Sequence, residues 1–111
     1  MGRNRDSIVE GLASEAIRLG ADALDIEYKG GCEQVFAVKD SLGHGIATFP
    51  SSSPEDALLR KELYGLQRRH RRVTVGDTEY NLRVRVYDSF GEDAFHVELR
   101  RRPQASKRQR E

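Results

Sequence analysis

The sequence predicts an α+β protein in which two helices pack on a mainly antiparallel sheet, in the order α-β-β-β-α-β-β-β. Two stretches, after Ser7 and after Ser53, combine a helix start signal with apolar residues at helical spacing. Six shorter stretches are rich in strand-forming residues and are separated by Gly, Asp and Ser. A chain of 111 residues with 37% hydrophobic residues builds one modest core, so a single domain is expected.

The first helix is expected from Ser7 to Gly20. Ser7 and Glu10 match the S-x-x-E capping box, in which the serine hydroxyl accepts a hydrogen bond from the backbone three residues later. Gly20 is a typical stop, directly after a last turn that contains Arg18. The apolar stripe of this helix consists of Ile8, Val9, Leu12, Ala13, Ala16, Ile17 and Leu19.

The first strand follows this helix. Leu24, Ile26 and Tyr28 alternate with Asp25 and Glu27, which predicts a strand with one buried and one solvated side. The pair Gly30-Gly31 ends it.

A second strand near residues 34–39 and a third near 45–49 are joined by a turn at 40–43, whose Asp, Ser and Gly suit a turn. Residues 35–38 are apolar on both faces, so the register of this pair stays open. We interpret Gly43-His44-Gly45 as a tight turn between strands rather than as a ligand site.

The second helix begins after a serine run. Ser53 is the expected N-cap, Pro54 occupies the first helical position, and Glu55 and Asp56 face the positive end of the helix dipole. Gly65 is a candidate early stop. The expected buried face consists of Ala57, Leu58, Leu59, Leu63 and Leu66.

The last third of the chain shows strict period-two alternation. It predicts strands around Val73–Val75, Tyr80–Val86 and Phe95–Leu99, with a polar loop between the last two. If Gly76-Asp77 is a two-residue turn, Val73 lies opposite Tyr80. Because the alternate residues are polar, we expect one face of the sheet to meet water and the other to meet the helices. The expected solvated residues are Arg72, Thr74, Asn81, Arg83, Arg85, His96 and Glu98.

The domain is expected over residues 6–100, between a flexible N-terminus at 1–5 and a flexible basic tail at 101–111. No apolar run approaches the roughly 18 residues that a membrane helix requires, and the start does not resemble a signal peptide. The sequence therefore predicts a cytoplasmic protein without membrane insertion.

The net charge of +1 conceals a division between basic and acidic segments. Residues 60–72 and 100–111 each carry a net charge of +5, whereas the remainder sums to −9. Such blocks attract nucleic-acid phosphates, anionic lipid or an acidic protein, or serve only as solvated surface. The candidate contact residues are Arg68, Arg69, Arg71, Arg72, Arg83, Arg85, Arg100, Arg101, Arg102, Lys107, Arg108 and Arg110.

No motif in the sequence indicates a reaction. Neither of the common glycine-rich phosphate-binding motifs is present, so no nucleotide cofactor is expected. Three scattered histidines and Cys32 alone do not make a zinc site, and Cys32 has no cationic neighbour in sequence to activate its thiol. The acids and hydroxyl at 88–89 and 91–93 are typical of a loop. We therefore expect no catalytic residue, no metal and no cofactor.

Several short stretches resemble a known bacterial domain. Residues 20–27, GADALDIE, are similar to the G-A-S-D-I-H-I-E stretch of the domain that precedes the motor domain in type II secretion and type IV pilus assembly ATPases, and Glu15-Ala16-Ile17 is similar to the E-A-I before it. Residues 80–84 and the later Gly91-Glu92 resemble that family's D-L-R-V strand and its following G-E. The resemblance covers about residues 7–100 and implies an α/β domain that packs against a nucleotide-binding motor and forms subunit contacts.

The sequence departs from that family at functional positions. Where the family reads V-R-[FY]-R-I-D-G, residues 35–41 read VFAVKDS, so both arginines are lost, and Asp25 replaces a histidine. A motor domain with its phosphate loop is not part of these 111 residues, so ATPase activity is not expected. The expected function is a non-enzymatic protein-interaction or regulatory module. The alternative is nonspecific nucleic-acid binding through the basic sheet face and the tail, and no feature of the sequence defines an oligomeric state.

Overall fold

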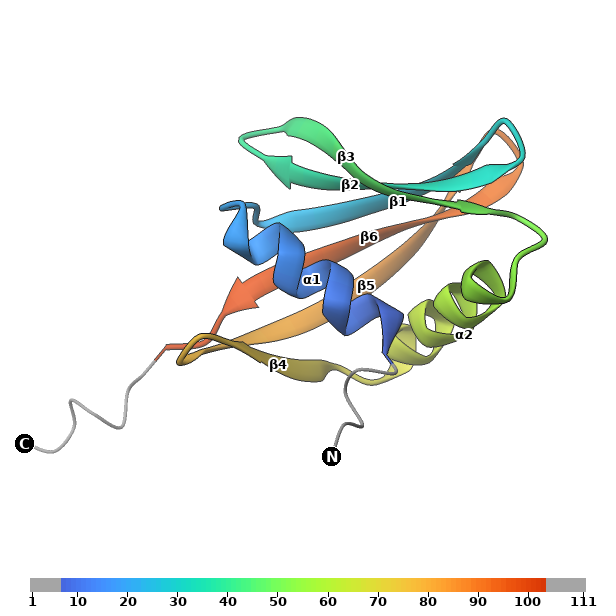
Figure 1. Ribbon diagram of the computed structural model, residues 1–111. Helices are drawn as coiled ribbons and strands as arrows, with labels where there is room; N and C mark the ends of the chain where they lie inside the picture. Colours follow the sequence, from blue (N-terminus) through green and yellow to red (C-terminus); the bar gives the residue numbers. More distant parts are fainter. Residues whose placement is uncertain (1–6, 104–111) are drawn as a thin grey trace, which may run out of the picture.

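The computed structural model describes residues 7–103 (Figure 1). Its element order confirms the predicted α-β-β-β-α-β-β-β plan. Each expected element is present, and most of the strands are longer than the sequence pattern indicated. The elements are α1 (Ile8–Arg18), β1 (Ala23–Lys29), β2 (Cys32–Lys39), β3 (Leu42–Pro50), α2 (Pro54–Arg68), β4 (Arg71–Val75), β5 (Thr78–Ser89) and β6 (Glu92–Arg101).

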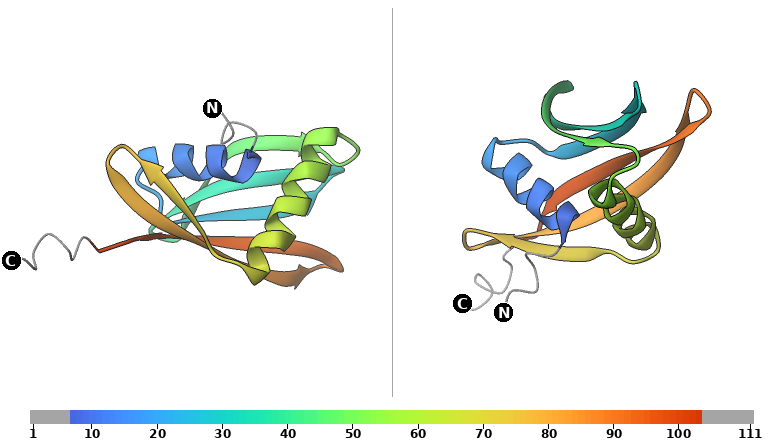
Figure 2. Two further views of the ribbon diagram at one scale, coloured as in Figure 1. Left: turned by 90° about the horizontal axis from the view of Figure 1, so that it is seen from below. Right: turned by 45° about the vertical axis from the view of Figure 1, so that its right-hand side comes forward.

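The six strands form one antiparallel sheet in the order β3-β2-β1-β6-β5-β4. The sheet curls, and both helices lie on the same side of it (Figure 2). The central contact is the pair β1 and β6, in which Ile26 lies opposite Phe95. This pair joins the first and second halves of the chain, so neither half completes the sheet alone.

The core lies between the sheet and the helices. Leu24 and Ile26 of β1 and Phe95 of β6 are fully buried, as are Leu59 and Leu63 of α2. The Tyr64 ring packs edge-on against Phe95, with ring centroids 5.1 Å apart and an interplanar angle of 78°. Edge-to-face contact of this kind adds attraction to the area that the rings bury.

The start of α1 is held by its own cap and by α2. The Ser7 hydroxyl accepts from the Glu10 backbone N–H at 3.2 Å, which confirms the predicted N-cap. The Glu10 side chain binds Arg71 instead of completing the capping box. The Glu62 carboxylate of α2 holds the helix start in a different way, since it accepts hydrogen bonds from the Ser7 hydroxyl and from the Ile8 and Val9 backbone N–H groups, the last at 2.9 Å. Contacts far apart in sequence therefore position α1.

In α2 the Ser53 cap and the Pro54 position are confirmed, but the expected stop at Gly65 is wrong. The helix continues to Arg68, because Gly65 keeps a right-handed backbone. Ala57 and Leu58 were also expected to be buried, yet both are exposed. The buried stripe of α2 is narrower than predicted and consists of Leu59, Leu63 and Leu66, together with Asp56.

Replacing Gly65 by alanine should stabilise the protein by about 0.5–1 kcal/mol, because alanine is the better helix former and a Cβ there meets no atom within 4 Å. The matched control is Gly76→Ala, which should destabilise because Gly76 has φ +68° in the β4–β5 turn. Urea unfolding measures whether the free energy of unfolding rises in Gly65→Ala and falls in Gly76→Ala. Equal changes in the two variants would contradict the helical assignment at Gly65.

The turn between β2 and β3 begins at the expected position but is shorter than the predicted 40–43, because β3 begins at Leu42. Asp40 and Ser41 form it, with φ 53° and 69°. Gly43-His44-Gly45 therefore belongs to β3, and its interpretation as a turn is wrong. A Cβ on Gly43 would lie 3.4 Å from the Cβ of Phe36 on the neighbouring strand β2. The Phe36 side chain therefore lies over β3 at Gly43 and Gly45, which have no side chains of their own.

The C-terminal strands are long. The two-residue turn at Gly76-Asp77 and the pairing of Val73 with Tyr80 are confirmed. The polar loop expected between the last two strands is wrong, because β5 and β6 continue through it and leave only Phe90-Gly91 as the turn. At the other end of this hairpin the Arg102 backbone N–H donates to the Glu79 carbonyl at 2.9 Å.

Candidate interaction surfaces

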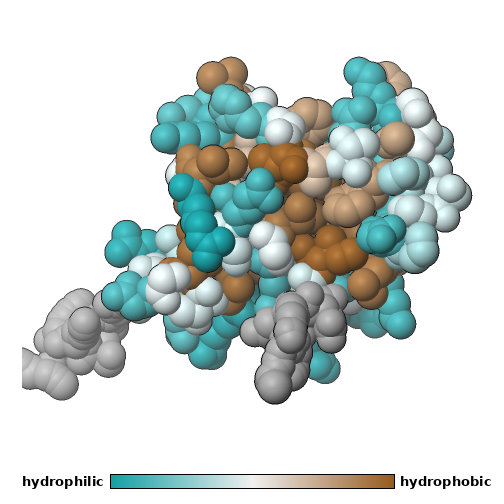
Figure 3. Space-filling view, viewed as in Figure 1, coloured by the Kyte–Doolittle hydropathy of each residue, from teal (hydrophilic) through white to brown (hydrophobic). Residues whose placement is uncertain are grey.

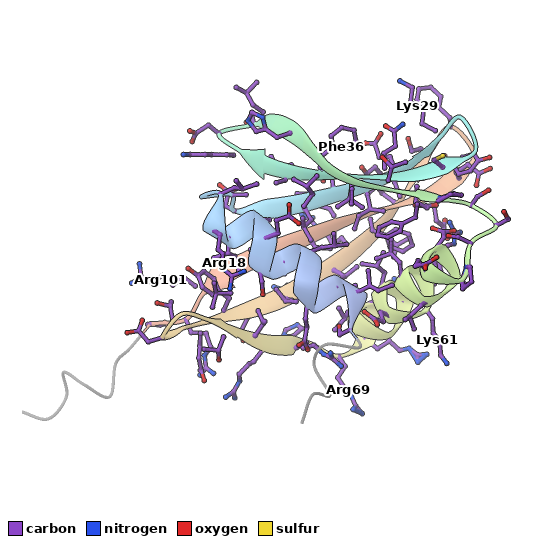
Figure 4. All side chains as sticks on the ribbon, viewed as in Figure 1. Arg18, Lys29, Phe36, Lys61, Arg69 and Arg101 are labelled. Atoms are coloured by element: carbon purple, nitrogen blue, oxygen red, sulfur yellow. The ribbon has the colours of Figure 1, made fainter. Side chains whose placement is uncertain are left out.

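The predicted basic residues separate into two groups. The first lies at the C-terminal end of α2, where Arg68, Arg69 and Arg71 line a groove of about 630 Å³. Leu58, Gly65 and Leu66 give this groove an apolar part, and Lys61, Glu62 and His70 complete its lining. Figure 4 shows Lys61 and Arg69 at the lower edge of the molecule, pointing outward. This groove, called the α2 groove below, combines apolar and cationic lining residues.

The second group lies on the sheet face that the helices leave uncovered. Arg72, Arg83, Arg85 and Arg100 alternate with buried residues and are exposed. They do not form a purely basic surface, because Glu98 lies opposite Arg83 in the sheet register. Glu98 also lies 3.8 Å from the Arg85 guanidinium and 3.6 Å from that of Arg100.

The neighbouring part of this face, over β1, is acidic. Asp25 lies 2.7 Å from His96 Nδ1, and the Tyr87 hydroxyl donates to Glu27 at 3.3 Å. Burial, with Glu27 and Asp25 nearby, raises the pKa of Tyr87 to about 12. The uncovered face therefore carries both signs of charge, which sequence alternation alone does not show.

The remaining predicted contacts are at the end of β6 and beyond it. Arg101 lies opposite Tyr80 in the β5–β6 register and is exposed. Arg102 pairs with Glu79 at 3.3 Å. These two arginines, expected in the tail, belong to the sheet margin. Lys107, Arg108 and Arg110 lie outside the described residues, as does the expected flexibility of the tail from 104 onward.

The turn between β5 and β6 exposes an aromatic side chain that the sequence reasoning missed. Phe90 is completely exposed and has φ 52°, and Gly91 follows with φ 85°. Tight hairpin turns of this kind usually place Asn, Asp or Gly first. Residues 88–93, called the β5–β6 tip below, read Asp-Ser-Phe-Gly-Glu-Asp and contain no basic residue. A phenylalanine-glycine pair between two alternating strands is the signal that could have identified this tip.

A second apolar area lies on the helix side of the sheet. Figure 3 shows brown surface in the gap between α1, β3 and α2, so the helices do not cover the sheet completely. The partly buried apolar residues that these elements contribute include Ile8, Ile46 and Phe49. Because these side chains pack against the core, the area is part of the fold as well as a surface.

The interior contains a charged cluster that the sequence reasoning also missed. Glu33 of β2 is completely buried, and its Oε2 accepts from Arg60 of α2 at 2.7 Å. Asp56, one turn earlier on the helix, is 2% exposed. Burial raises the pKa of Glu33 and of Asp56, although Arg60 lowers both. In β2, Glu33 alternates in phase with the buried Val35 and Ala37, so it lies on the same inward face. This alternation is the sequence signal that could have identified Glu33 as buried.

No group of three or more potential metal ligands occurs among residues 7–103. Cys32 is a partly buried free thiol, and His44 and His70 are exposed. No helix within the described part of the chain is long and apolar enough to span a membrane. Comparison with protein-family models and with curated proteins gave no match to this sequence.

Proposed function

We propose that this protein is a non-enzymatic protein-interaction or regulatory module and that the β5–β6 tip is its contact element. The observation that carries this proposal is the complete exposure of Phe90. Burying a phenylalanine side chain stabilises a protein by roughly 1.5–3 kcal/mol, whereas this fold leaves the apolar surface of Phe90 in water. A bulky residue at positive φ also adds backbone strain of about 1 kcal/mol or more.

An asparagine at position 90 would form the same turn without strain or exposed apolar area. The stability of the fold therefore does not explain Phe90, whereas a partner does, because aromatic side chains are enriched in protein interfaces and anchor them. The resemblance to the accessory domain of secretion and pilus ATPases agrees with an interaction role. The proposal includes no ATPase activity, since the sequence has no phosphate-binding loop.

Replacing Phe90 by serine should abolish partner binding while the free energy of unfolding changes by less than about 1 kcal/mol, because the side chain makes no buried contact. The measurement is affinity capture from native lysate at low and physiological salt, with urea unfolding as a check on the fold. Leu42→Ser is the matched control, since Leu42 is also an exposed apolar residue, at 65%, beside a different turn. Capture that Phe90→Ser leaves unchanged would contradict the proposal.

Nucleic-acid binding is a second candidate, favoured by the four exposed arginines of the uncovered sheet face. Neutralisation of about four phosphates predicts that log affinity falls with log salt at a slope of roughly −2.8 for single strands and −3.6 for duplex. The double variant Arg83→Glu and Arg85→Glu should remove most of this binding in a gel-shift titration. Absence of binding up to about 100 μM at low salt would eliminate this candidate.

A further inference from the structure

We infer that the partner of the β5–β6 tip is a second copy of this chain, which receives Phe90 in its α2 groove. The inference rests on the proposed function, because it names the partner of the same tip. Two independent features of the molecule carry it: the chemistry of the tip and the chemistry of the groove.

The tip presents one exposed aromatic ring that acids flank in the sequence. Asp88, Glu92 and Asp93 all lie within three residues of Phe90, and the tip has no basic residue. Asp88 accepts from the Gly91 backbone at 3.4 Å, and Asp93 accepts from the Tyr64 hydroxyl of α2. These hydrogen bonds hold the turn and its base. A complementary surface must therefore offer an apolar pocket with a positive rim.

The α2 groove has this composition. Its apolar part includes Leu58, which is 40% exposed although it is a large aliphatic residue. Its lining also includes Lys61, Arg68 and Arg69, which have no ion pair among the described residues. Glu62, which is the only acid among the described residues that line the groove, is engaged by the start of α1. Its volume of about 630 Å³ is within the range of pockets that bury drug-sized ligands, so it admits an aromatic ring.

Within one molecule the two surfaces face in different directions. The β5–β6 tip lies at the upper right of Figure 1, whereas Lys61 and Arg69 point away from the lower edge in Figure 4. A tip and a groove that meet must therefore belong to different copies. If the two copies exchange tips reciprocally, the contact closes into a two-fold dimer. Otherwise it is head-to-tail, leaves one tip and one groove free on each pair, and propagates into rings or open chains.

The test is sedimentation velocity of the full chain over a concentration series. We expect the weight-average mass of the wild type to rise with concentration, and the association to weaken at least about tenfold between 50 and 500 mM NaCl, because the contact joins opposite charges. Phe90→Ser and the double variant Arg68→Glu, Arg69→Glu should each remain monomeric. Leu42→Ser should associate like the wild type.

The decisive sample is an equimolar mixture of the tip variant and the groove variant. The tip variant keeps an intact groove and the groove variant keeps an intact tip, so the mixture should form a one-to-one dimer that grows no further. A monomeric mixture, or a groove variant that associates like the wild type, would overturn the inference. If the wild type is monomeric but captures a different protein through Phe90, self-association fails and the proposed function stands. If the wild type neither self-associates nor captures another protein through Phe90, both the inference and the proposed function are refuted.

Discussion

Replacing Phe95 by alanine should destabilise the protein by about 3–5 kcal/mol, which is a large part of the total stability of a domain of this size. Phe95 is completely buried at the centre of the sheet, and it loses its edge-on contact with Tyr64 when the ring is removed. The strand around it is paired on both sides, with Ile26 and with Val86, so the backbone cannot close the cavity. Equilibrium urea unfolding measures the loss.

Phe95→Leu is the control, because it keeps an apolar side chain and leaves a smaller cavity. It should lose roughly 1–2 kcal/mol, less than half of the alanine effect. An alanine variant within about 1 kcal/mol of the wild type would show that Phe95 does not fill the core as described.

Replacing Arg60 by leucine should destabilise the protein by about 3–5 kcal/mol at neutral pH, because it leaves the Glu33 carboxylate buried without its partner. The double variant Glu33→Leu, Arg60→Leu should recover part of this loss, since the buried Glu33 carboxylate is then gone, although Asp56 still loses the favourable charge of Arg60. Urea unfolding of the single and double variants completes the comparison. A double variant as unstable as the single one would contradict the pairing.

The Arg60→Leu deficit should shrink as the pH falls. Burial raises the pKa of Glu33 above its ordinary 4.5, so the folded state binds this proton more tightly than the unfolded state. Protonation therefore favours folding, and this contribution is lost as the pH rises through the raised pKa. Arg60 lowers the pKa of Glu33, so without Arg60 the pH range in which protonation of Glu33 favours folding extends to higher pH. A deficit that is constant or larger at acidic pH would contradict this assignment.

The helices and strands were predictable because their signals are local. Ser53 with Pro54 marks the start of α2, and the Gly76-Asp77 turn fixes the pairing of Val73 with Tyr80. Alternation identified which side of β5 and β6 faces the core. The strand ends were less accurate, because pairing with a neighbouring strand extends a strand beyond its alternating segment, as in β6.

The features missed by sequence reasoning depend on distant contacts or unusual turns. Glu33 is buried because Arg60, 27 residues away, reaches it from α2. Gly43 belongs to β3, where it pairs with Val38 and lies beside the Phe36 side chain of β2, contacts that local sequence does not show. Phe90 occupies a turn position that seldom holds an aromatic residue, so propensity places a loop there. Of the predicted basic residues within 7–103, all are exposed except Arg102, which is partly buried, but their division among separate surfaces follows only from the fold.

The most direct test of the proposed contact is an amide NMR spectrum of the full chain recorded at about 50 μM and about 1 mM. We predict that rising concentration shifts or broadens the signals of residues 88–93 and of residues 58–71, while those of Arg83, Arg85, Ile46 and Phe49 stay in place. Phe90→Ser should remove the changes at both sites together. Perturbation confined to the uncovered sheet face or to the gap beside β3, or identical spectra at the two concentrations, would contradict contact between the β5–β6 tip and the α2 groove.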